Sequence, residues 1–128
     1  MGFDQYHEPP DELSQETRTL ARLFASLTEE AEAINWYEQR LSVEQDPEAR
    51  AIIEDARHEE YKHFSMDLEF LLRRRPEWRS LAHGVLFRSG EITDNADAAE
   101  EAAEGGDIEP AAAGNDGSLG IGGLRGAR

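Results

Sequence analysis

Three side chains of metal-binding types occur at spacings that would bring them together on helices. Glu60 and His63 are three residues apart, so on a helix their side chains are neighbours. Glu30 interrupts a series of apolar residues at three- and four-residue steps, which comprises Leu23, Leu27, Ile34 and Tyr37. A carboxylate that faces a core needs a partner, because burying it unpaired is costly. A metal ion would be such a partner for Glu30.

Glu30 from one helix and Glu60 with His63 from another would form half of a di-iron ligand set. The complete set takes one Glu from each of two helices and Glu-x-x-His from each of two more, so two copies of the chain would supply it. Carboxylate and imidazole ligands suit iron. A Glu-x-x-His pair also occurs on solvated, salt-bridged helix faces, and the pattern alone leaves that alternative open.

Two long helices are expected to carry these residues. Ser14 is a good N-cap for a helix that continues to about Ser42. The run Asp46-Pro47-Glu48 starts a second helix, which should continue to about Arg75 because Pro76 ends it. The short link between the two helices predicts an antiparallel hairpin.

The hairpin lies within a predicted helical half-domain over residues 14–92, which follows an N-terminal arm over residues 1–13. Pro76 should open a short third helix that ends near Phe87. A single hairpin leaves its apolar stripe uncovered, and pairing two copies into a four-helix bundle would cover it. We therefore expect an all-α fold in which a dimer forms a ferritin-like four-helix bundle.

The C-terminal part of the sequence has a different character. Residues 93–116 are rich in Ala, Asp, Glu and Gly, and this composition predicts a flexible acidic linker. Residues 117–128 place apolar side chains among glycines, namely Leu119, Ile121 and Leu124. Such a segment suits an extended peptide that binds in a groove of another protein, and the linker would let several copies bind one scaffold.

The composition excludes several classes of function. The net charge of −15 argues against a nucleic-acid partner and favours the attraction of cations. The chain has no cysteine, so it can form neither a disulfide nor a thiolate metal site. No apolar run is long enough for a membrane span, and no signal peptide is expected.

Other residues are weaker candidates for the site. Glu29 and Glu32 flank the face of Glu30 and suit either an outer cation site or a solvated acidic surface. Tyr37 suits either a hydrogen bond to a metal ligand or core packing. Asp67, four residues after His63, could orient the imidazole, but a surface position is the simpler expectation.

Two runs of this sequence resemble the helix signatures of the encapsulated ferritins. They are Glu29-Glu30-Ala31-Glu32-Ala33-Ile34-Asn35-Trp36-Tyr37 and His58-Glu59-Glu60-Tyr61-Lys62-His63. Residues 117–126 also resemble the cargo-loading peptide with which such proteins enter encapsulin shells. Lys62 and Asp67 depart from the family pattern, which often has an acidic residue and Thr there.

The resemblance implies a ferroxidase that oxidises Fe(II) with oxygen and serves iron storage. Its di-iron centre would take Glu30, Glu60 and His63 as ligands, with Tyr37 beside them. Glu29 and Glu32 would form an outer metal site, which could also take other divalent cations such as Ca(II).

The resemblance further implies a ring of five dimers, a homodecamer, inside an encapsulin nanocompartment of a bacterial or archaeal cytoplasm. A non-catalytic cation-binding cargo protein and a peroxide-reducing di-iron protein are the alternatives.

Overall fold

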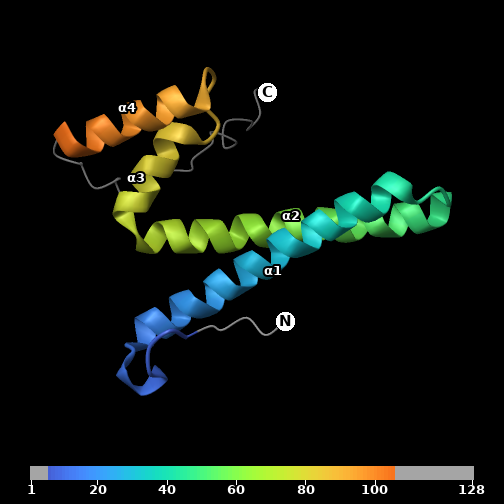
Figure 1. Cartoon of the computed structure of the whole chain (residues 1–128), viewed down its shortest axis with the longest axis horizontal. Coiled ribbons are helices and arrows are strands. Elements are labelled where there is room, and N and C mark those ends of the chain that lie inside the picture. Colours follow the sequence, from blue (N-terminus) through green and yellow to red (C-terminus); the bar gives the residue numbers. More distant parts are fainter. Residues whose placement is uncertain (1–5, 106–128) are drawn as a thin grey trace, which may run out of the picture. The chain divides into compact units, whose positions relative to one another are not determined.

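The computed structural model describes residues 6–105, and every regular element in that range is helical. A short 3-10 helix, η1, precedes four α-helices (Figure 1), which are η1 (Pro10–Glu12), α1 (Gln15–Val43), α2 (Pro47–Arg74), α3 (Pro76–Val85) and α4 (Ile92–Gly105). The all-α class predicted from the sequence is confirmed. The chain divides after Arg74 into two compact units, of which the first contains α1 and α2 and the second contains α3 and α4.

The first unit begins at the predicted N-cap. Ser14 has an extended backbone, and its hydroxyl accepts a hydrogen bond of 3.1 Å from the backbone N–H of Thr17. This bond satisfies one of the N–H groups that the first turn of a helix leaves unpaired. The arm before it is held to α1 because the Arg18 guanidinium donates a hydrogen bond to the carbonyl of Pro10.

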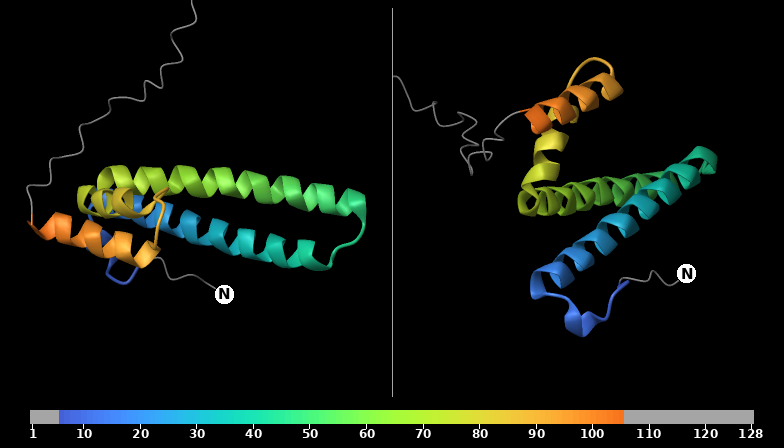
Figure 2. Two further views of the ribbon diagram at one scale, coloured as in Figure 1. Left: turned by 90° about the horizontal axis from the view of Figure 1, so that it is seen from above. Right: turned by 60° about the vertical axis from the view of Figure 1, so that its left-hand side comes forward.

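The turn between α1 and α2 is held by side chains on both sides. Glu44 Oε1 accepts hydrogen bonds from the backbone N–H groups of Gln45 and Asp46, at 3.1 and 3.0 Å. Asp46 Oδ1 accepts one of 2.9 Å from Ala49 N–H, as expected of the N-cap that the sequence predicts. Figures 1 and 2 show the result, with α1 and α2 lying side by side and joined by a short turn.

Arg50 secures the end of α1 from α2. Its Nη1 donates to the carbonyls of Leu41 and Glu44, at 2.6 and 2.9 Å. The last carbonyl groups of a helix have no hydrogen-bond donor within the helix, so the Arg50 guanidinium acts as their donor. The register between the two helices is therefore fixed at the turn.

A second polar link joins the helices further along. Arg57 Nη1 lies 2.8 Å from Glu38 Oε1, and the Tyr61 hydroxyl donates to the same oxygen at 3.0 Å. The Arg57 guanidinium also lies over the Tyr61 ring, 5.7 Å from its centre. These contacts join α1 to α2 through residues that are far apart in the sequence.

The core of the described residues is small. Its buried apolar side chains are Leu20, Ala25, Leu41, Leu71 and Leu72. Large apolar side chains of the hairpin stay exposed, including Phe24 at 41%, Trp36 at 51%, Ile52 at 66% and Met66 at 56%. A monomer rarely leaves so much apolar surface uncovered without an interaction partner. The exposure is consistent with the predicted pairing of hairpins, which a single chain does not show.

The second unit differs from the sequence prediction. The linker predicted from residue 93 is wrong for the described part, because Ile92–Gly105 forms helix α4. The segment is poor in large apolar residues, which suggested disorder, but alanine has the highest helix propensity and gives α4 a narrow face. Residues 106–116 of the predicted linker and the predicted peptide over residues 117–128 lie outside the described range.

α3 and α4 pack through small residues and a tight turn. A Cβ atom placed on Gly84 would lie 2.4 Å from the Cβ of Ala99, so the two helices approach too closely there for any side chain. α3 ends at Val85, two residues before the predicted end, because Leu86 has an extended backbone. Phe87 then adopts a left-handed backbone with φ of 61°. Gly90, with φ of 96°, completes the reversal of the chain.

In the part of the chain that the structure describes, no helix combines the length and apolar character needed to cross a membrane.

Candidate metal centre

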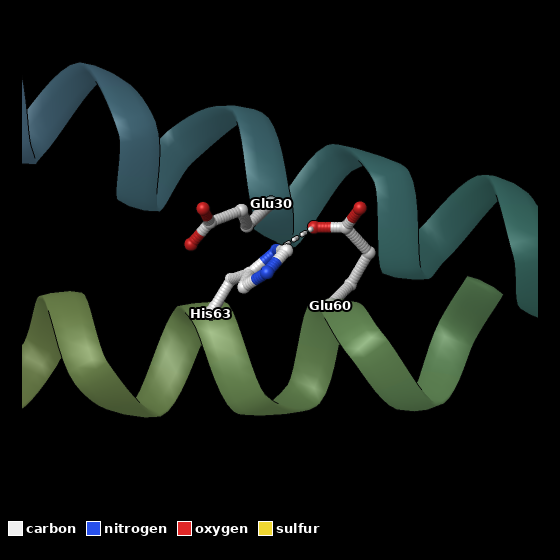
Figure 3. Close-up of side chains that lie close together, drawn as sticks. All are labelled: Glu30, Glu60 and His63. Carbon is white, nitrogen blue, oxygen red and sulfur yellow. Dashed lines mark ion pairs between the residues drawn. The ribbon is translucent and has the colours of Figure 1, made fainter. Parts of the chain in front are cut away.

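The hairpin brings the three predicted ligands together. Glu30 from α1 and Glu60 and His63 from α2 each offer one ligand atom, and these atoms all lie within 4.8 Å of one another. Figure 3 shows the three side chains between the two helices, with the His63 ring beside the Glu60 carboxylate. All three side chains are partly buried, so an ion could reach them from solvent and keep part of its hydration shell.

Glu60 and His63 contact each other directly. The His63 Nδ1 atom lies 3.5 Å from Glu60 Oε2 (Figure 3), the distance of a loose ion pair between residues three apart on a helix. Both groups are good ligands of the same ion when the imidazole is neutral at the coordinating nitrogen. Their proximity is the local geometry that the Glu-x-x-His spacing predicts.

Glu30 is in an unfavourable environment for a lone carboxylate. Burial is the main cause that raises its pKa, to about 7, followed by hydrogen bonding with Asp67 and by the charges of Asp67, Glu60 and Glu29. Its Oε2 atom is buried without a hydrogen-bond partner. Such an oxygen requires a proton or a cation. The surroundings of Glu30 therefore favour the binding of a cation.

The donor set fits iron. It combines two carboxylates with one imidazole, which are ligand types of non-haem iron sites. Three ligand groups leave coordination positions open, so one chain does not enclose an ion. A second set of ligands would be needed to hold two ions close together.

The remaining predicted residues lie outside this group of three. Glu29 and Glu32 are exposed on α1, and Glu29 influences Glu30 through its charge. Tyr37 is half-buried on α1, and the Arg40 guanidinium lies over its ring at 5.4 Å. Their roles at the site stay predictions.

Asp67 lies closer to the site than the sequence suggested. The simpler expectation was a surface residue, but Asp67 is half-buried and contacts Glu30 from the opposite helix. Its spacing held the relevant signal, since positions 60, 63 and 67 follow one helix face. Lys62, another departure from the family pattern, forms an ion pair with Glu59 at 2.7 Å.

Comparison with known proteins gives consistent matches. The EncFtn-like family matches residues 5–89. The encapsulated ferritin-like protein of Rhodospirillum rubrum is 43% identical over 122 residues, which cover 94% of this chain and 87% of that protein. A ferritin-like protein of Thermotoga maritima is 43% identical over 91 residues, which cover 71% of this chain and 80% of that protein.

A solved structure agrees with the fold. The crystal structure of protein ne0167 from Nitrosomonas europaea matches with a TM-score of 0.67 and 40% identity, over 70% of this chain and 99% of that one. The helical hairpin, the three predicted ligands that it brings together and these matches lead to one conclusion, which the sequence resemblance had predicted: this chain belongs to the EncFtn-like family.

Proposed function

We propose that this protein is a ferroxidase, which oxidises Fe(II) to Fe(III) with oxygen at a di-iron centre formed between two copies of the chain. The observation that supports this most is the convergence of Glu30, Glu60 and His63, whose ligand atoms lie within 4.8 Å of one another on two neighbouring helices. In this proposal iron is the substrate, and the ligands hold it while it gives up an electron.

A second copy is part of the proposal because one hairpin holds only half of the ligand set. Two copies would bring four carboxylates and two imidazoles to two ions. The exposed apolar side chains of the hairpin, among them Phe24 and Met66, favour burial of this kind against a partner. We infer a ring of five such dimers from the family resemblance alone.

Each ligand has a distinct task in this scheme. Glu30 of each copy would bind the ions, by bridging or chelating them, and this would give its buried, unpartnered oxygen a positive partner. Glu60 and His63 would complete the coordination of one ion. Two Fe(II) ions held side by side could each give one electron to the same oxygen molecule, so that two Fe(III) ions form and the oxygen takes up two electrons and two protons.

The acidic surface would deliver the substrate. Glu29 and Glu32 are both exposed on α1, next to Glu30, and would collect Fe(II) or another divalent cation such as Ca(II) before transfer inward. Tyr37, half-buried on the same helix, would hydrogen-bond to a ligand or to bound water.

The product would be stored in a surrounding shell. The relative from Rhodospirillum rubrum is described as encapsulated. For this chain we propose that residues 117–128 bind an encapsulin shell protein through Leu119, Ile121 and Leu124. Deleting residues 117–128 should leave iron oxidation intact and abolish loading when the shell protein is co-expressed, and loading that persists would refute this role.

Oxygen consumption after addition of ferrous salt tests the enzymatic proposal. Wild type should consume oxygen rapidly, and Glu30→Gln should lose most of that rate. Glu101→Gln on α4 removes one exposed carboxylate elsewhere and serves as the matched control. Full activity in Glu30→Gln would remove the site assignment.

The same assay separates the alternatives. Tight metal binding without oxidation would indicate a cation-binding cargo protein. Oxidation that requires peroxide in place of oxygen would indicate a peroxide-reducing di-iron protein.

A further inference from the structure

The carboxyl group of Asp67 lies beside Glu30, next to the group that Glu30, Glu60 and His63 form. Asp67 lies on α2, one helical turn after His63, and is close enough to Glu30 on α1 for its carboxyl group to raise the pKa of Glu30. Asp67 Oδ2 is buried without a hydrogen-bond partner, and so is Glu30 Oε2. Among the described residues, these are the only two carboxylate oxygens left in that condition.

A protein cation does not balance this pair. The ion pairs formed by the described residues include neither Glu30 nor Asp67. Two carboxylate oxygens are both acceptors, so they can lie together only if a proton or a metal ion stands between or beside them. The location of the pair at the three predicted ligands favours a metal ion.

The extra carboxylate changes the charge balance of the proposed dimer site. Glu30 and Glu60 from two copies carry a formal charge of −4, which balances two Fe(II) ions. With Asp67 from each copy the charge is −6, which balances two Fe(III) ions. A negative group close to an ion in a partly desolvated site stabilises the higher charge more strongly.

We propose that Asp67 is a charge-setting residue of this site, which makes the site prefer trivalent over divalent ions. The inference rests on the proposed function and deepens it. Asp67 favours the oxidised product and so assists the oxidation of Fe(II), at the cost of slower release of Fe(III).

Binding of redox-inactive ions tests this without relying on activity. Zn(II) stands in for the divalent ion, and Ga(III), supplied in a nitrilotriacetate-buffered solution, stands in for the trivalent one. In full-length protein, Asp67→Asn should lower the ratio of Ga(III) to Zn(II) affinity by about tenfold, since one lost contact charge acts more on the trivalent ion. Asp67→Glu, which restores the charge, should recover most of that ratio.

Two further variants make the result interpretable. Asp97→Asn removes an exposed carboxylate from α4 and should keep the wild-type ratio, which excludes an effect of net charge. Glu30→Gln should abolish site-specific Zn(II) binding, which establishes that the titrated site is the proposed one.

The outcomes separate the two proposals. Zn(II) binding that depends on Glu30, together with an unchanged ratio in Asp67→Asn, would overturn the role of Asp67 and leave the metal site standing. An equal loss of affinity for both ions would show a purely structural role and also overturn it. Absence of Glu30-dependent binding of either ion in wild type would overturn the metal site and, with it, this inference.

Discussion

The carboxyl groups of Glu30 on α1 and Asp67 on α2 lie within hydrogen-bonding reach of each other, although they come from different helices. Folding of the hairpin forces this contact, since residues distant in sequence meet only when the helices pair. Two ionised carboxylates in such contact repel, and the pKa of Glu30 rises to about 7 in response to burial and to its acidic neighbours. The folded, metal-free protein therefore keeps a proton on Glu30, and it becomes less stable when that proton is lost.

We expect the metal-free protein to become less stable as the pH rises from about 5 to about 7.5. The pKa of Glu30 is raised from 4.5 to about 7 by folding, so the folded chain keeps a proton that the unfolded chain releases. Linkage then makes stability fall with rising pH through this window. The loss should be on the order of 1 kcal/mol, below the full linkage value because the site is partly open to water.

Urea unfolding in the presence of a chelator measures this dependence at each pH. Glu30→Gln has no such proton to lose, so the difference between it and wild type should grow in favour of the variant as the pH rises. Glu101→Gln should follow wild type. A difference that stays constant across the window would contradict the raised pKa.

We expect metal ions to promote self-association of this chain. Carboxylates from two copies would repel each other until a cation lies between them, and metal binding then contributes to the free energy of assembly. Sedimentation velocity under anaerobic conditions should show a larger species after Fe(II) addition, and a chelator should reverse the change. Glu30→Gln should weaken the response, and an identical sedimentation profile with and without metal would argue against the shared site.

The contact of Arg57 with Glu38 should contribute measurably to the stability of the hairpin. A double-mutant cycle of Arg57→Ala and Glu38→Ala should give a coupling on the order of 0.5–1 kcal/mol, because the pair joins two helices but stays partly exposed. The pair Arg73 and Glu69, within α2 alone, is the comparison and should couple less. Equal coupling in both pairs would show that the cross-helix link has no special role.

Much of the hairpin could be predicted because its signals are local. The caps at Ser14 and Asp46 and the stop at Pro76 act through neighbouring backbone groups, so the sequence alone places the helix ends. Helix α4 could not be placed this way. Its composition resembles that of a disordered acidic segment, and the close fit of Ala99 against Gly84 becomes visible only in the folded chain.

The site follows the same division. Glu60 and His63 are adjacent on one helix, and a spacing of three residues predicts their contact. Glu30 was predicted from its place on an apolar helix face. That place indicates where its side chain points, but it does not indicate which residues the side chain contacts. The contact of Asp67 with Glu30 depends on the register between α1 and α2, and no pattern within either helix encodes that register.

Gly84 should be required for the packing of α4 on α3. Gly84→Ala adds a Cβ that would lie 2.4 Å from that of Ala99, so α4 must shift or detach. Helix propensity favours alanine over glycine by about 1 kcal/mol, which would stabilise α3 if packing did not matter. We expect the overlap to outweigh this gain, since overpacking typically costs about 1–3 kcal/mol. Hydrogen exchange of the α4 amides should therefore become faster in Gly84→Ala, and Ala99→Gly in the same chain should slow it again by removing the opposing Cβ. Unchanged exchange in Gly84→Ala would mean that the two helices can separate at this point without cost.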